Sequence, residues 1–363
     1  MKILNLPVNS TSFGNVSFGI LNELYERKYD DFILQYLNQP DLRSFNYRRE
    51  DNNFINWLNE KSDNFLSRYK RDYHTMRLWH INGSESFVGD ARTLYTFNES
   101  DSLTPVEVNI LNSHNQIIVS CDYSRQVFED SGVESLINVV PLGFDKSHFN
   151  NNLKRKVPSQ VCSILINGKF EARKGHLKLI PLVLNKFANN PNYLINLAVY
   201  NIHLSPEDNN RILSQFFPKG KPYNVNIHPF YSTLSELNDL YSNIDIVLDG
   251  SYAETWSIPS FTCTALGKYS VVNNASGIKE WANENNSVLV NPSNKEPMKD
   301  NMFFSGEGNF NVGNWSVWDE DDFSAGIDKA IKLWKSNPIN SEGLKLQEEF
   351  TWAKSVDKLL SVI

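Results

Sequence analysis

One stretch in the C-terminal half of the chain constrains its fold more than any other. The run from Ile244 to Leu248 is short and rich in β-branched residues, which predicts a buried strand. A polar loop follows, and then Ser257 as a cap and Pro259 in the first turn predict the start of a helix. Gly267 is placed to end that helix. The pattern is that of a strand joined to a helix by a polar loop.

The chain then returns to a strand at 270–272, so the unit is strand, acidic loop, helix and strand. A parallel sheet made of such units binds its ligand at the carboxyl ends of the strands. The helix would offer free N–H groups and a positive dipole end to a phosphate. Glu254, in the loop before it, is suited to accept hydrogen bonds from sugar hydroxyls. A phosphate beside a sugar indicates a nucleotide-sugar.

Length and composition set the frame for this unit. The 363 residues exceed what one core usually holds, so we expect two domains. The net charge of −7 does not favour a protein that binds polyanions. The three cysteines are widely spaced, which predicts small buried residues in a reducing compartment. No apolar run approaches the roughly 18 residues of a membrane helix, and we expect a soluble, cytoplasmic protein.

The stretch around Glu254 resembles the donor-site signature of retaining glycosyltransferases with the GT-B fold, in the glycogen-synthase-like group known as family 4. The resemblance is carried by Ser251, Glu254, Ile258, Pro259, Ala265, Gly267 and Val271. That family usually has two glutamates separated by seven residues, and here the second position is Thr262. The resemblance implies that Glu254 contacts the donor sugar, that Ser257 and Ile258 line the donor site, and that Thr262 meets the ribose without a charge.

A second segment carries the cations that such a donor needs. Where the family usually has Gly-Arg and Lys-Gly, this chain has Gly168-Lys169 and Lys174-Gly175. The resemblance implies that Lys169 and Lys174 clamp the diphosphate, on which negative charge grows as the glycosidic bond breaks. Lysine keeps the charge of arginine but not its bidentate grip. The loop ending at Tyr231 is implied to lie against the base.

The N-terminal half begins as another doubly wound unit. Residues 2–8 predict a strand, and a polar loop with Gly14 leads into an amphipathic run. The resemblance implies that Gly14 faces the cleft between the domains, although a plain turn residue would look the same. His80 follows a short strand at 77–79. In the resembled family a histidine here often reaches the donor sugar or the acceptor, whereas a lone histidine at a strand end is commonly structural.

Glu99 and Asp101 lie in a segment that resembles a "Glu-Thr-Asp" stretch of one branch of these transferases. The resemblance implies that both meet the acceptor. The alternative is that they cap the helix beginning near Pro105, because acids gather at helix starts. Residues 297–318, rich in phenylalanine, tryptophan and glycine, are longer than usual for the family. Their rings suit either loop packing or sugar stacking.

The resemblance covers most of the chain and predicts an α/β protein of the GT-B class, with two doubly wound Rossmann-like domains and an active site between them. We expect an acceptor-side domain at 1–152, completed by a terminal helix at 345–363. A nucleotide-sugar-binding domain is expected at 158–340, after a polar linker.

The function that this implies is the transfer of a sugar from a nucleotide-sugar, most simply a UDP-sugar, to an acceptor hydroxyl with retention. His80, Lys174 and Glu254 would carry the chemistry, and no metal or further cofactor would be required. One alternative is a sugar-nucleotide epimerase or a binding module, which the missing second glutamate permits. Another is the same transfer to hydroxymethylated DNA bases, for which the arginines and aromatics at 40–77 would serve as a nucleic-acid face. We favour a solvated helical surface as the explanation of that stretch.

Overall fold

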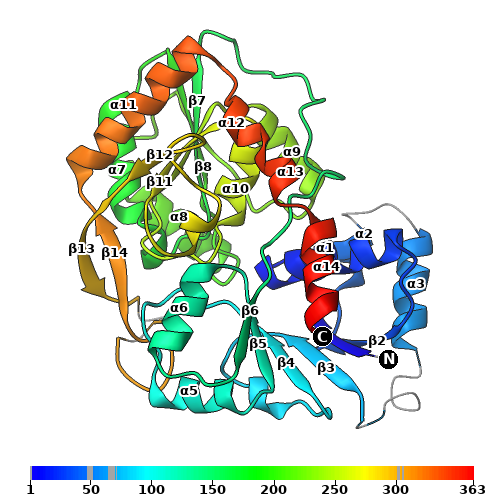
Figure 1. Cartoon of the computed structure of the whole chain (residues 1–363). Helices are drawn as coiled ribbons and strands as arrows, with labels where there is room; N and C mark the ends of the chain where they lie inside the picture. Colours follow the sequence, from blue (N-terminus) through cyan, green and yellow to red (C-terminus); the bar gives the residue numbers. More distant parts are fainter. Residues whose placement is uncertain (1, 47–51, 64–69, 71, 301–302, 305) are drawn as a thin grey trace.

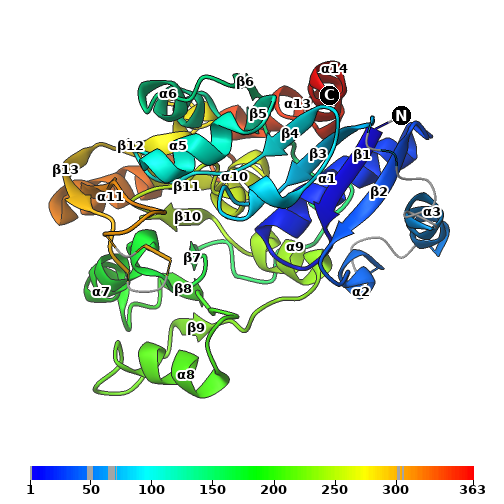
Figure 2. The ribbon, with the colours of Figure 1, turned by 90° about the horizontal axis from the view of Figure 1, so that it is seen from below.

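The computed structural model describes residues 2–46, 52–63, 70, 72–300, 303–304 and 306–363. It contains two six-stranded parallel sheets flanked by helices, one in each half of the chain (Figure 1). The predicted α/β class with two doubly wound units is therefore confirmed. The twisted strands of both sheets can be followed from below in Figure 2.

The first sheet has the order β2-β1-β3-β4-β5-β6. Its strands are β1 (Lys2–Pro7), β2 (Phe32–Leu37), β3 (His74–Leu78), β4 (Arg92–Tyr95), β5 (Gln116–Val119) and β6 (Leu136–Val139). Its helices are α1 (Ser12–Glu26), α2 (Leu42–Asn46), α3 (Asn52–Ser62), α5 (Pro105–Asn112) and α6 (Asp122–Asp130), with a 3₁₀ turn η1 (Ser84–Ser86). The strand order reverses between β1 and β3.

The second sheet has the order β12-β11-β10-β7-β8-β9. Its strands are β7 (Cys162–Asn167), β8 (Tyr193–Ala198), β9 (Val225–Ile227), β10 (Ile246–Asp249), β11 (Tyr269–Asn273) and β12 (Val288–Val290). Its helices are α7 (His176–Phe187), α8 (Pro206–Ser214), α9 (Leu234–Ser242), α10 (Ile258–Ala265) and α11 (Glu320–Ser336), with 3₁₀ turns η2 (Ala172–Lys174) and η3 (Ser276–Glu280). Here the order reverses between β7 and β10.

A two-stranded hairpin made of β13 (Pro292–Pro297) and β14 (Asn314–Trp318) occupies the aromatic stretch. Trp315 and Trp318 are buried, so loop packing explains these two rings. The segment connecting the two strands reaches the first domain, where the Thr104 hydroxyl donates to the Asn309 carbonyl at 2.6 Å. The hairpin therefore joins the two domains on the side of α5 (Figure 1).

The basic stretch at 40–77 is only partly covered, because Arg48, Arg49, Arg68 and Arg71 lie outside the described residues. Of the rest, Arg43 is exposed and lies 3.6 Å from Asp41. Arg77 is buried, and its Nε donates to the Asn5 side chain at 2.6 Å. Within the described residues, no helix is both long and apolar enough to cross a membrane.

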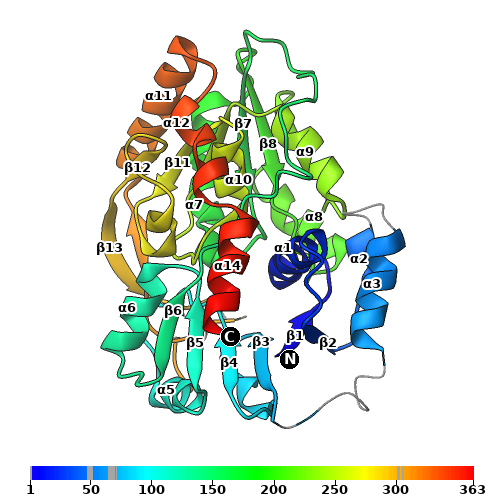
Figure 3. The same ribbon diagram turned by 45° about the vertical axis from the view of Figure 1, so that its right-hand side comes forward.

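The C-terminal segment ties the halves together. The short helices α12 (Ser341–Leu344) and α13 (Leu346–Glu349) contact α10 of the second domain, and α14 (Trp352–Val362) packs on α1 of the first (Figures 1 and 3). The Trp352 ring occupies a notch at Gly19, where an added Cβ would come within 2.1 Å of it. Close packing of this kind leaves no room for a further methyl group.

We therefore predict that Gly19→Ala lowers the free energy of unfolding by about 1–3 kcal/mol through overpacking. Chemical denaturation measures the change. Combining it with Trp352→Leu should cost less than the sum of the two single changes, because the smaller side chain removes the clash. Strict additivity would contradict this account of the notch.

Candidate active site

The loops that leave β7 and β10 lie side by side, because these two strands pair directly at the point where the strand order reverses. Such a switch point opens a crevice at the carboxyl ends of the strands. The loop after β7 carries Lys169 and Lys174, and the loop after β10 carries Glu254. Gly175 permits the contact, because a Cβ there would lie 2.3 Å from the Gly250 carbonyl oxygen.

Glu254 lies where these two loops meet, with only 7% of its surface exposed. Its Oε1 accepts a hydrogen bond from Arg173 Nη1 at 2.7 Å and another from the Lys174 ammonium. Its backbone N–H donates to the Ser276 hydroxyl at 2.9 Å. A buried carboxylate is stable only when it is paired, and here two cations share it.

Arg173 links this carboxylate to two others. Its Nη2 lies 3.3 Å from Glu171 and 3.8 Å from Glu99, which belongs to the first domain. Lys169 in turn lies 2.8 Å from Glu171. The two predicted diphosphate cations are therefore connected to Glu254 in different ways, Lys174 directly and Lys169 through Glu171 and Arg173.

Two carboxylates of this network have pKa values shifted in opposite directions. Burial raises the pKa of Glu99 above its usual value, although the charge of Arg173 opposes the shift. Burial would also raise the pKa of Glu171, but Arg173 and Lys169 together hold it below its usual value. The structure thus brings the predicted acceptor residue Glu99 to the predicted donor cluster.

Asp249, at the end of β10, has a role that the sequence did not reveal. It accepts hydrogen bonds from the hydroxyls of Ser251 at 2.5 Å, Ser260 at 2.7 Å and Ser257. Burial would raise its pKa, but the charge of Lys174 and these hydroxyls lower it. The prediction that the Ser257 side chain caps the helix is wrong, because its hydroxyl donates a hydrogen bond to Asp249 instead.

The start of α10 consequently has no side-chain cap. Ser257 precedes the helix with a φ of 57°, and Ile258, the first helical residue, is partly buried. Thr262 lies one turn further on and is 4% exposed. A helix start without a side-chain cap is suited to an anion, because its first N–H groups have no partner within the helix.

His80, on the loop that leaves β3, and Gly14, in the helix that follows β1, lie at the other switch point. The His80 ring is accessible to solvent and lies 4.6 Å from the Phe13 ring. Desolvation by the surrounding protein, and then the charge of Lys169, lower its pKa. The charge of Lys169 in the second domain therefore acts on His80 of the first domain. Gly14 lies in the first turn of α1 rather than in the loop, where a Cβ would meet the Asn9 carbonyl oxygen at 2.0 Å.

Asp101 contacts the hairpin. Its Oδ1 accepts from the Asn314 backbone N–H at 2.7 Å, and its Oδ2 lies 2.7 Å from Lys295 Nζ. The alternative that Glu99 and Asp101 cap the following helix is wrong. Thr104 caps α5, and Glu107 completes the capping box.

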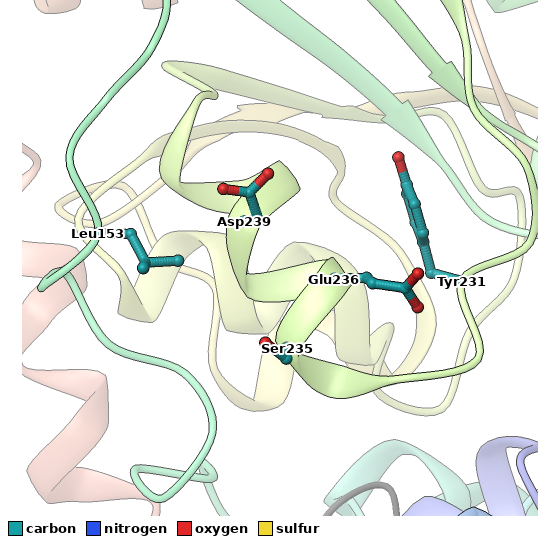
Figure 4. Close-up of a pocket in the computed structure, with 5 residues that line it drawn as sticks. All are labelled: Leu153, Tyr231, Ser235, Glu236 and Asp239. Carbon is teal, nitrogen blue, oxygen red and sulfur yellow. The ribbon is translucent and has the colours of Figure 1, made fainter.

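Tyr231 follows β9, and its hydroxyl is 2.8 Å from His228 Nδ1. The tyrosine lines a shallow hollow on α9 with Leu153, Ser235, Glu236 and Asp239 (Figure 4). No residue of the Glu254 network lines that hollow.

The sequence interpretation missed Arg173, Glu171 and Asp249. Arg173 and Glu171 lie between the predicted lysines, and Asp249 directly follows the apolar run that ends at Leu248. Their places in the sequence therefore suggested a site, but the sequence did not indicate which groups they bind. Among the residues that the structure describes, no group of three or more His, Cys, Asp or Glu side chains could hold a metal ion.

We predict that Asp249→Asn lowers the free energy of unfolding at neutral pH by about 1–3 kcal/mol, because the amide cannot accept all three hydroxyls. Since the pKa of Asp249 is lowered by folding, its ionised form stabilises the fold above the unfolded-state value of about 3.9. The stability gap between wild type and variant should therefore narrow as the pH falls below that value. Denaturant titration across the acidic range measures it, and a constant gap would contradict the ionised role.

No protein-family model matches this sequence, and no curated protein matches it either. Solved structures, however, resemble it over the full chain. Sucrose-phosphate synthase from Thermosynechococcus elongatus superposes with a TM-score of 0.67 at 14% identity, over 100% of this chain and 98% of that one. A glycosyltransferase from Rickettsia africae gives 0.67 at 14% identity over 99% and 97% of the two chains.

Anabaena HepE in complex with UDP-glucose gives a TM-score of 0.64 at 16% identity over 100% of both chains. These neighbours are GT-B glycosyltransferases. The two six-stranded parallel sheets with flanking helices match them over the full chain. The chain has the GT-B fold.

Proposed function

We propose that this protein is a retaining glycosyltransferase that moves a sugar from a UDP-sugar to an acceptor hydroxyl without a divalent metal. The observation that carries the proposal is the buried Glu254, held by Arg173 and Lys174 at the carboxyl end of β10. It lies beside an uncapped helix start and opposite residues of the first domain. The carboxylate that would bind the sugar and the helix start that would bind the phosphate are thus adjacent.

The diphosphate would bind Lys169, Lys174 and the start of α10. As the bond between the sugar and the phosphate breaks, these groups stabilise the charge that grows on the leaving oxygen. The acceptor oxygen would form the new bond from the same face, and its proton would pass to the departing phosphate. That course retains the configuration of the sugar and needs no protein nucleophile.

The titles of the structural neighbours support the choice of donor. HepE was solved with UDP, with UDP and glucose, and with UDP-glucose. The pneumococcal O-GlcNAc transferase GtfA was solved with UDP and GlcNAc, and this chain covers 59% of it. Uridine diphosphate is therefore the nucleotide to test first.

The remaining roles follow from position. The second domain, 158–340, would bind the donor, with Ser257, Ile258 and Thr262 along α10 and Tyr231 toward the base. The first domain, 1–152 with Gly14 at its switch point, would bind the acceptor. His80 and Glu99 would face the sugar or the acceptor, whereas Asp101 could do so only if it released the hairpin.

A screen of nucleotide-sugars by thermal shift tests the donor. A ligand at about 100 times its dissociation constant adds about 2.7 kcal/mol to the free energy of unfolding. The same mixtures are then assayed for free UDP. A transferase passes the sugar to an acceptor or to water and sets UDP free, whereas an epimerase binds the donor and releases no UDP overall. Absence of binding to every UDP-sugar would overturn the proposal.

We predict that Glu254→Gln lowers the rate of UDP release by about 10²-fold, because the sugar loses the carboxylate that orients it. Glu284→Gln is the matched control, since Glu284 is exposed. Its rate and melting temperature should equal those of the wild type. An active Glu254→Gln variant would remove Glu254 from the proposed mechanism.

A further inference from the structure

We infer that Arg173 is a positioning residue, which keeps Glu254 in place when Lys174 leaves it to bind the diphosphate of the donor. This inference rests on the proposed function. It begins from one atom, because Glu254 Oε1 accepts hydrogen bonds from both Arg173 and Lys174. A donor that needs Lys174 for its phosphates and Glu254 for its sugar must separate that pair.

Lys174 is the partner that can move. Its ammonium is a point charge on a flexible stem. The stem passes beside Gly168, where an added Cβ would lie 3.4 Å from Lys174 Cε and 3.6 Å from Nζ. Gly168 has a φ of +126° and directly precedes Lys169, the other proposed diphosphate ligand. The ammonium therefore already lies on the side where the phosphates would bind.

Arg173 is the partner that cannot move. Its Nη1 also donates to the Ala253 carbonyl at 2.7 Å, and its Nη2 lies 3.3 Å from Glu171. Its own carbonyl accepts from the Tyr252 backbone N–H at 2.8 Å. Only 7% of the residue is exposed. A planar guanidinium fixed on several sides holds its geometry when one neighbour leaves.

The electrostatics require such a residue. Once Lys174 is on the diphosphate, Glu254 would be a buried carboxylate without a cation if Arg173 were absent. An unpaired buried charge is strongly unfavourable, so Glu254 would turn away or draw Lys174 back. Either outcome would misplace the sugar. Arg173 also lies 3.8 Å from Glu99, so the same guanidinium connects the donor carboxylate to the acceptor side.

The test compares four variants by two measurements. Calorimetry gives the dissociation constant of UDP, which has the diphosphate but no sugar. Steady-state kinetics gives kcat for UDP release from the UDP-sugar that the wild type uses. The variants are Arg173→Gln, Arg173→Lys, Lys174→Gln and Arg155→Gln. Arg155 is the structural control, because it pairs with Asp245 through Nη2 at 2.8 Å.

We expect the two variants to differ in how the loss divides between UDP binding and kcat. Lys174→Gln should weaken the binding of UDP by about tenfold or more, because a charge-assisted hydrogen bond is lost. Arg173→Gln should weaken the binding of UDP less than Lys174→Gln does. It should nevertheless lower kcat by about 10²-fold, because the sugar is misplaced. Arg173→Lys should recover most of kcat. Arg155→Gln should lower the melting temperature without reproducing either pattern.

The inference would be overturned if the loss of kcat relative to the loss of UDP affinity were the same in Arg173→Gln as in Lys174→Gln. A wild-type kcat in Arg173→Gln would overturn it as well. Both outcomes would leave the proposed function standing, since the wild type would still release UDP. A wild type that neither binds UDP nor releases it would overturn the proposed function, and the inference with it.

Discussion

The pairing of Glu254 with Arg173 and Lys174 is the interaction on which the rest of this structure depends. A carboxylate so deeply buried must be matched by cations, and both cations come from the loop after β7. The pairing therefore fixes two loops that are about 80 residues apart in sequence. Glycine at position 175 lets their backbones approach closely enough. One ion network thus marks the place where the chemistry is proposed.

Other contacts also join the domains, and two of them bear on function. Trp352 in its notch at Gly19 secures the terminal helix to the first domain. The hairpin secures the opposite side through Asp101 and Thr104. With these contacts in place, Glu99 meets the arginine of the donor network. The hairpin also brings the Phe303 ring to 5.4 Å from Lys169, so an inserted segment borders the donor lysine.

Much of the fold and part of the site could be predicted. The apolar run ending at Leu248 and the glycine at 267 define a strand and a helix that the structure confirms, because they depend on local preferences. The hydrogen-bond partner of the Ser257 hydroxyl could not be predicted, because a serine before a helix can either cap that helix or donate to a carboxylate elsewhere. Glu99 and Asp101 failed as helix caps for a similar reason, since Thr104 was the better cap and both acids had partners in the other domain.

The sequence by itself determined the alternation of strands and helices, the lysines and glutamate of the crevice, and the resemblance to the GT-B class. Periodicity and turn residues act over a few neighbours, so a linear pattern suffices for them. Only the tertiary structure decided that Arg173 is shared among three carboxylates and that Asp249 collects three hydroxyls. The partners of Arg173 come from two loops of the second domain and one of the first, whereas those of Asp249 come from the loop and helix that follow it. Which groups pair with a buried charge depends on geometry that exists only once the chain has packed.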